Sequence, residues 1–130
     1  MDYQRPYLLA LDGDESVLRN IAGISGPHFE TLTTRDPKRF MGWVSSYTNV
    51  AVVVTEHVLE TAAGVALLEQ VRMMRPSAKR VLLTTYHDLA SIVQGIHSGA
   101  IDVLVQKPFT ELELLTAIRP PMASQARAVG

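Results

Sequence analysis

The chain lacks cysteine altogether, has nearly balanced charge and contains no long apolar segment. Without cysteine it forms no disulfide and no thiolate metal site, and this composition fits a reducing cytosol. The net charge of -1 gives no electrostatic reason to expect binding to nucleic acid or to an anionic membrane. No stretch approaches the roughly 18 apolar residues of a membrane span, and the first residues do not resemble a secretory leader. We therefore expect a cytoplasmic protein whose partners are neither nucleic acid nor membrane.

Enough apolar residues are present, in contrast, for one well-packed core. Hydrophobic residues make up 47% and charged residues 19% of the 130. These fractions are ordinary for a globular protein and argue against general disorder. A chain of this length fits one domain, and no internal repeat is evident, so we expect a single domain.

Strand-like and helix-like patterns alternate five times along the chain. Short apolar runs predict strands at Tyr7–Leu11, Phe29–Thr34, Val50–Thr55, Arg80–Thr85 and Val103–Gln106. Apolar residues at helical spacing predict a helix after each strand, starting near Asp14, Asp36, Ala62, Asp88 and Thr110. The uncharged, β-branched third run should lie at the centre of a sheet and the Thr-rich second run at an edge. This alternation predicts an α/β fold built on a parallel sheet.

Polar motifs stand at the carboxyl ends of four of these apolar runs. They are Leu11-Asp12-Gly13-Asp14, Thr55-Glu56-His57, Thr84-Thr85-Tyr86 and Gln106-Lys107-Pro108-Phe109. The carboxyl ends of parallel strands meet at one edge of the sheet, where α/β proteins place their sites. Carboxylates with an ammonium and a hydroxyl suit a phosphoryl group or a divalent metal, because oxygen ligands bind hard cations and lysine supplies a point charge for phosphate.

The spacing between these motifs and two glycines identifies a family resemblance. Glu56 lies eight residues before Gly64, Thr84 lies fifteen before Gly99, and Lys107 opens a Lys-Pro-Phe sequence. In these features the chain resembles the receiver domain of two-component response regulators, over about residues 6–119. The resemblance implies an α/β, flavodoxin-like, doubly wound sheet of five parallel strands in the order 2-1-3-4-5. Residues 120–130 would then be a tail or the start of a linker.

The same resemblance assigns roles to the motif residues. It places Glu56 at the phosphoacceptor position, where the family has Asp, Thr84 at the signalling position and Lys107 at the phosphate-binding position. Lys107 lies one residue further from the preceding helix than is usual, so we expect a bulge or a longer loop before it. The aromatic residue that normally precedes this lysine is missing, since Val103 and Leu104 occupy that region.

Magnesium binding by such a site should be weak or absent. Asp12 falls on the first acid of the family's acidic motif, but Gly13 replaces the second acid and Asp14 occupies the third position. The possible Mg²⁺ ligands that remain are Asp12, Asp14 and Glu56, so the affinity for Mg²⁺ should fall. We expect no other cofactor.

The two altered positions predict that the chemical step is lost. Glu carries its carboxylate one methylene further than Asp, and misplacement by roughly 1 Å can cost about a hundredfold in rate. The interpretation that follows is a degenerate receiver, a regulatory protein-interaction module that is not an enzyme. Glu56 would act as a fixed anion, pairing with Lys107 and reaching Thr84 somewhat as a phosphoryl group would.

Other interpretations remain open on the sequence alone. A haloacid-dehalogenase-like, Mg²⁺-dependent phosphohydrolase would use Asp12 and Asp14, with Thr84 and Lys107 as its hydroxyl and lysine. A flavodoxin would share the fold class, but the first strand is not followed by a Ser/Thr/Gly-rich phosphate loop. Both aspartates can also simply cap a helix. The histidines show no metal-ligand spacing and are expected in loops or at the surface. They are His28, His57, His87 and His97.

Protein partners follow from the resemblance rather than from composition. Receivers act with a histidine kinase and an output domain, and they commonly self-associate or dock through the fourth helix, fifth strand and fifth helix. In this chain that surface corresponds to about Leu89–Ile118. The expected partners are therefore a histidine kinase, an output domain or a second copy of the chain.

Overall fold

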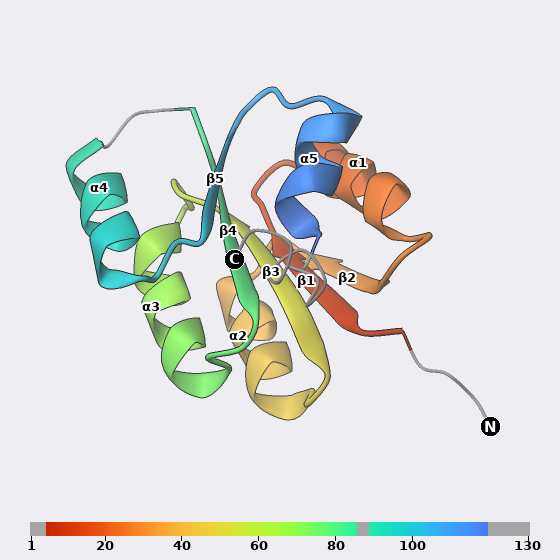
Figure 1. The fold of residues 1–130 in the computed structure, drawn as a ribbon, viewed down its shortest axis with the longest axis horizontal. Coiled ribbons are helices and arrows are strands. Elements are labelled where there is room, and N and C mark those ends of the chain that lie inside the picture. Colours follow the sequence, from red (N-terminus) through yellow and green to blue (C-terminus); the bar gives the residue numbers. More distant parts are fainter. Residues whose placement is uncertain (1–4, 86–88, 120–130) are drawn as a thin grey trace, which may run out of the picture.

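This computed structural model describes residues 5–85 and 89–119. Within these residues the chain forms five strands, each followed by a helix (Figure 1). The strands are β1 (Tyr7–Leu11), β2 (Glu30–Thr34), β3 (Val50–Glu56), β4 (Lys79–Thr84) and β5 (Val103–Gln106). The helices are α1 (Glu15–Ser25), α2 (Pro37–Ser46), α3 (Gly64–Met74), α4 (Leu89–Ser98) and α5 (Glu111–Ile118). Each strand lies within one residue of its predicted bounds. The predicted Asp88 cap of α4 falls outside the described residues.

All five strands are parallel and lie in the order β2-β1-β3-β4-β5. The predicted strand order is therefore confirmed, with β3 at the centre and β2 at an edge. A bulge or a longer loop was expected before Lys107. β4 and β5 pair in regular register from Val81 with Val103 to Thr84 with Gln106, so no bulge precedes Lys107.

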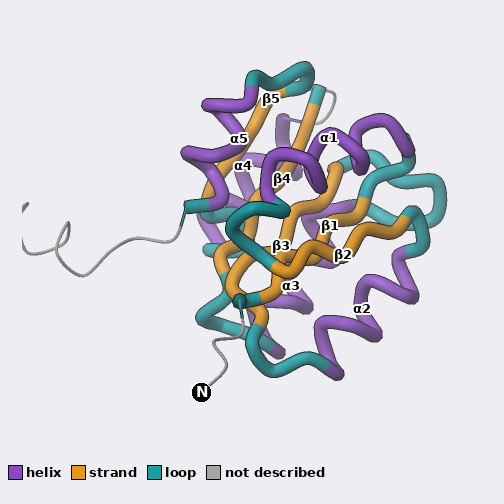
Figure 2. Tube along the Cα trace, turned by 90° about the vertical axis from the view of Figure 1, so that its right-hand side faces the viewer, coloured by secondary structure: helices purple, strands orange, loops and turns teal. Residues whose placement is uncertain are grey.

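Two helical layers cover the sheet, as Figures 1 and 2 show. Side chains alternate between the two faces of each strand, so neighbouring residues enter different cores. Leu8 and Ala10 pack with α1 and α5, whereas Leu9 and Leu11 pack with α2, α3 and α4. All four are fully buried, which explains why β1 reads as a continuous apolar run. No helix within residues 5–85 and 89–119 combines the length and hydrophobicity needed to cross a membrane.

Side-chain caps define where three of the helices begin. Asp14 accepts a hydrogen bond from the Ser16 amide at 2.8 Å, and Asp36 accepts one from the Lys38 amide at 2.9 Å. Thr110 forms a capping box at the start of α5. The predicted caps of α1, α2 and α5 are thus confirmed, and each satisfies amides that the helix itself leaves unpaired.

Gly64 and Gly99, from which the spacing of the motifs was counted, lie at helix ends. Gly99 follows α4 with φ +87°, a backbone conformation that side chains other than glycine rarely adopt. Gly64 starts α3 and donates its N–H to the His57 carbonyl at 2.7 Å. A Cβ on Gly64 would overlap the carbonyl oxygen of Glu56 and lie 2.9 Å from the Cα of His57. The close approach of α3 to the end of β3 therefore requires glycine, and it fixes the distance in sequence back to Glu56.

Substitution of Gly64 by alanine should destabilise the fold by about 2–3 kcal/mol, because the new methyl group meets backbone atoms that have no room to move. The matched control is Gly23→Ala at an exposed position in the last turn of α1, where a Cβ would meet nothing within 4 Å. That change should stabilise the protein by about 0.5–1 kcal/mol, since alanine favours the helix. Urea unfolding measures both free energies. Equal effects of the same sign would contradict this account of Gly64.

Candidate functional site

The register of the sheet brings three of the motif residues together at its carboxyl edge. Leu11 pairs with Thr55, so Asp12 and Glu56 each follow a paired residue on adjacent strands. On the other side of β3, Glu56 pairs with Leu83 of β4. The backbone N–H of Lys107 donates to the Thr84 carbonyl at 2.8 Å and continues the β4–β5 pairing. The sequence prediction that these residues share one crevice is thus reproduced by the strand pairing.

The Lys107 ammonium joins the two carboxylates. Its Nζ lies 2.7 Å from Oδ2 of Asp12 and 2.8 Å from Oε2 of Glu56. Asp12 is fully buried, while the side chains of Lys107 and Glu56 are 14% and 22% exposed. A buried carboxylate is costly unless it is paired and hydrogen-bonded. Asp12 meets both conditions, since its Oδ1 also accepts the Asp14 amide at 2.9 Å.

The second oxygen of Glu56 binds a backbone amide that sequence reasoning did not single out. Gly13 N–H donates to Oε1 of Glu56 at 3.0 Å. A Cβ on Gly13 would lie 3.4 Å from this same oxygen, so an acidic side chain there would project from a point already in contact with the Glu56 carboxylate. The glycine removes that repulsion and supplies a donor. Gly13 and Glu56, the two departures from the family pattern, are therefore compatible with one another. The only indication of their contact in the sequence was that both belong to the same predicted site.

The carboxylates named from the sequence as possible Mg²⁺ ligands all have partners within the chain. Asp14 directs its Oδ1 to the amide and hydroxyl of Ser16, at 2.8 and 2.7 Å. Asp12 and Glu56 share Lys107 instead, and Gly13 offers no side-chain oxygen. Among the described residues no three His, Asp or Glu side chains are grouped to hold a metal. A hard divalent cation needs several oxygen ligands directed at one point.

The pKa values of the three groups follow from burial and pairing. Burial raises the pKa of Asp12 above its ordinary value, because the hydrogen bond from Lys107 only partly offsets the loss of solvent. Burial acts in the same direction on Glu56, but the hydrogen bonds from Lys107 and the Gly13 amide outweigh it, so this pKa is lowered. Burial alone would lower the pKa of Lys107, yet the two carboxylates raise it. Lys107 therefore stays cationic.

Thr84 and His57 lie beside this cluster. Thr84 ends β4 and is 3% exposed, a position consistent with a strand-end hydroxyl. His57 was expected in a loop or at the surface; it lies in the connection between β3 and α3, but its side chain is buried rather than at the surface. Its amide donates to the Leu83 carbonyl at 2.9 Å and its carbonyl accepts the Gly64 amide. The β3–α3 connection thus continues the sheet pairing for one residue beyond Glu56, which places His57 inside the protein.

A parallel sheet of this order, with an acid, a second acid and a lysine at its carboxyl edge, defines the receiver class of α/β domains. The sequence profile of the response regulator receiver domain matches residues 9–119. The chain belongs to this family, and it is a receiver domain of two-component signalling. The phosphohydrolase alternative has no support. Receiver domains are generally not enzymes, and in general they interact with histidine kinases and output domains.

Known proteins agree with the assignment. The photosynthetic apparatus regulatory protein RegA of Rhodovulum sulfidophilum is 31% identical over 119 residues, which cover 87% of this chain and 61% of RegA. The chain therefore spans less than two thirds of that relative's length. A receiver domain of an HD domain-containing protein from Pseudomonas fluorescens Pf-5 superimposes with a TM-score of 0.82 and 28% identity, covering 99% of this chain and 95% of the other. A CheY-like receiver from Methanospirillum hungatei JF-1, 20% identical with a TM-score of 0.83, covers 96% and 99% and shares the fold.

Replacement of Lys107 by methionine should destabilise the protein by about 3 kcal/mol near neutral pH, because it leaves two adjacent carboxylates without a counter-ion. The loss should shrink on acidification. In the native chain the lowered pKa of Glu56 keeps this carboxylate charged throughout the range from about pH 7 to pH 5, so the stability that it contributes is retained there. In the variant, burial and mutual repulsion raise the carboxylate pKa values, so protonation adds stability as pH falls.

Urea unfolding of both proteins between about pH 7 and pH 5 measures this difference. The control is Lys38→Met, which removes an exposed lysine from the first turn of α2 and should change stability by less than about 0.5 kcal/mol at either pH. A difference between Lys107→Met and the native chain that stays constant or grows on acidification would contradict the pairing described above.

Proposed function

We propose that this receiver domain signals without phosphorylation, as a protein-interaction module in which Glu56 is a fixed anion. The observation that carries the proposal is the Lys107 ammonium, held at 2.8 Å by Glu56 and at 2.7 Å by Asp12. In an active receiver this lysine holds a phosphoryl oxygen. The Glu56 carboxylate offers the lysine a comparable negative partner permanently, although with less charge and fewer acceptor oxygens than a phosphoryl group. Contact between Glu56 and Thr84 remains a prediction.

Loss of the chemical step is argued from the state of the same carboxylate. One Glu56 oxygen accepts from Lys107 and the other from the Gly13 amide, so an attack on a phosphoryl donor would compete with these bonds for the oxygen lone pairs. The extra methylene also shifts the carboxylate from the position that Asp would take. The engagement of Asp14 as a helix cap supports a weak or absent Mg²⁺ site. We therefore propose a domain with no bound cofactor and no enzymatic activity of its own.

Partner binding is proposed for the surface formed by α4, β5 and α5, within Leu89–Ile118. Large apolar side chains are exposed there, and they are Leu89 (61%), Val93 (50%), Ile96 (50%) and Leu112 (72%). Grouped exposed apolar residues mark interaction surfaces in soluble proteins. The surface would serve a histidine kinase, an output domain or a second copy of the chain, in the cytoplasm. Residues 6–119 would form the receiver unit, with 120–130 as a tail or linker.

Sedimentation velocity over a range of concentrations tests the second copy as occupant. A dimer that is lost in Val93→Asp would assign this surface to self-association. The control Met73→Asp changes an 82% exposed side chain on α3, outside the surface, and should leave such a dimer intact. A monomer at every concentration would leave the kinase and the output domain as the candidates.

Incubation with acetyl phosphate and Mg²⁺ should leave the intact mass of the native chain unchanged, because neither the acceptor geometry nor the metal ligands are in place. The matched variant Gly13→Asp/Glu56→Asp restores both residues to the family pattern and should gain a phosphoryl adduct. Mass spectrometry reads both results. An adduct on the native chain would refute the proposal.

A further inference from the structure

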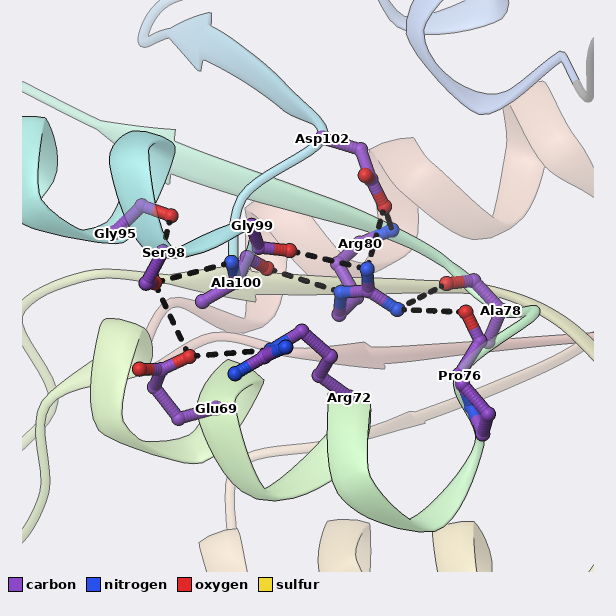
Figure 3. Close-up of polar contacts among 10 residues, drawn as sticks. All are labelled: Glu69, Arg72, Pro76, Ala78, Arg80, Gly95, Ser98, Gly99, Ala100 and Asp102. Carbon is purple, nitrogen blue, oxygen red and sulfur yellow. Dashed lines mark hydrogen bonds and ion pairs between the residues drawn. The ribbon is translucent and has the colours of Figure 1, made fainter.

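Arg80 is a buried cation at the amino edge of the sheet, the edge opposite the Asp12, Glu56 and Lys107 cluster. It is the second residue of β4 and is only 6% exposed. A buried charge is costly unless hydrogen bonds replace its hydration. Figure 3 shows how the guanidinium meets this requirement, since acceptors from two loops surround it.

The guanidinium donates to four backbone carbonyls. Nη1 reaches Pro76 at 3.2 Å and Ala78 at 2.9 Å in the loop between α3 and β4. Nε reaches Ala100 at 3.2 Å and Nη2 reaches Gly99 at 3.0 Å, both in the loop between α4 and β5. One side chain thus joins two loops that lie about twenty residues apart in sequence.

Asp102 completes the arrangement from the start of β5. Its Oδ2 accepts the backbone N–H of Arg80 at 2.8 Å and lies 3.5 Å from Nη2 of the same residue. The Asp102 amide in turn donates to the Arg80 carbonyl at 2.8 Å. Arg80 therefore fixes the chain on both sides of the α4–β5 loop, at the end of α4 and at the first residue before β5 (Figure 3).

Further contacts hold the C-terminal half of α4 in the same place. Ser98 donates to Glu69 of α3 at 3.2 Å, and the Ile101 amide donates to the Gly95 carbonyl at 3.1 Å. A Cβ on Gly95 would lie 2.7 Å from Ile101 and 3.0 Å from Val65, so α4 packs closely here. The Arg80 contacts thus belong to a tightly packed region.

Only arginine has the geometry that these contacts need. Its planar fork carries five donors, whereas a lysine ammonium is a single point with three. The carbonyls of Gly99 and Ala100 also stand at the negative end of the α4 dipole, which a cation stabilises. The side chain therefore satisfies four carbonyls and one helix end at once.

We propose that Arg80 is a positioning residue that holds the C-terminal end of α4 and the start of β5 at fixed places on the sheet. Arg80 and Thr84 lie on the same face of β4, at opposite ends of the strand. A change that begins beside Thr84 would therefore turn α4 about its held end rather than shift the whole helix. That this movement would reorient the α4–β5–α5 docking surface rests on the proposed function. The anchoring of the α4–β5 loop by Arg80, called the clamp below, does not.

Hydrogen exchange of the variant Arg80→Met tests the clamp without any partner. Amides of residues 95–102 should exchange about tenfold faster or more than in the native chain. The reason is that the carbonyls of Gly99 and Ala100 lose the hydrogen bonds from Arg80 that anchor this segment. Amides in β1 and α1 should keep their native rates. The control Lys79→Met changes the neighbouring residue, whose ammonium binds the Arg119 carbonyl at 2.7 Å on the opposite face of the strand. It should accelerate exchange at the end of α5 instead.

A uniform rise in exchange along the whole Arg80→Met chain would overturn the proposal, because general destabilisation would then explain the faster exchange. Unchanged exchange rates at residues 95–102 would also overturn the proposal. If Arg80→Met does not fold, Arg80→Lys retains the charge without the fork and should still show faster exchange confined to 95–102 and to the α3–β4 loop, whose carbonyls the same side chain binds. Native rates in the lysine variant would overturn the argument. A phosphoryl adduct in the mass experiment would refute phosphorylation independence and leave this exchange pattern as predicted.

Discussion

The parallel direction of all five strands imposes one electrical polarity on the domain. Every helix begins near the carboxyl edge of the sheet and ends near its amino edge, so the positive helix ends share one side and the negative ends the other. Acids cap helices at the first edge. Cations at the second edge donate to helix-end carbonyls, through Arg5 to Gly26, Arg75 to Val44, Lys79 to Arg119 and Arg80 to Gly99. Lys107 is a cation at the carboxyl edge, where the acids lie. Its ion pairs with Asp12 and Glu56 give the lysine and both carboxylates a partner of opposite charge.

This contact also explains why the two altered positions belong together. A longer carboxylate at Glu56 reaches the Gly13 amide, and the absence of a side chain at Gly13 leaves the space and removes a competing negative charge. An acid at position 13 would add a third carboxylate beside Asp12 and Glu56, with Lys107 as their shared counter-ion. Together they give a pocket whose carboxylate oxygens have partners within the chain. The altered pair is thus consistent with a stable charge arrangement rather than with damage to a working one.

Much of this organisation could be predicted from the sequence, for identifiable reasons. Short apolar runs predicted the strands, and Gly64 and Gly99 were sound reference points for counting because close packing and a positive φ require glycine there. The burial of His57 and the role of Arg80 could not be predicted. Each depends on which loops face a strand end, and residue type and periodicity do not carry that information. The choice between a bulge and a longer loop before Lys107 could not be made from the sequence for the same reason, and the regular β4–β5 register excludes the bulge.

Burial separates the site positions that match the family pattern from those that depart from it. Asp12 is fully buried and Lys107 is its counter-ion, so removal of the lysine would leave an unpaired charge in the interior, and removal of Asp12 would take away one of the two partners of the lysine. Gly13 is exposed and Glu56 is only half-buried, so these positions can change without isolating a buried charge. Asp12 and Lys107 are therefore needed for stability even where no phosphoryl group is bound. A receiver that loses its chemical step would retain these two residues for folding alone, and their presence by itself does not indicate phosphorylation.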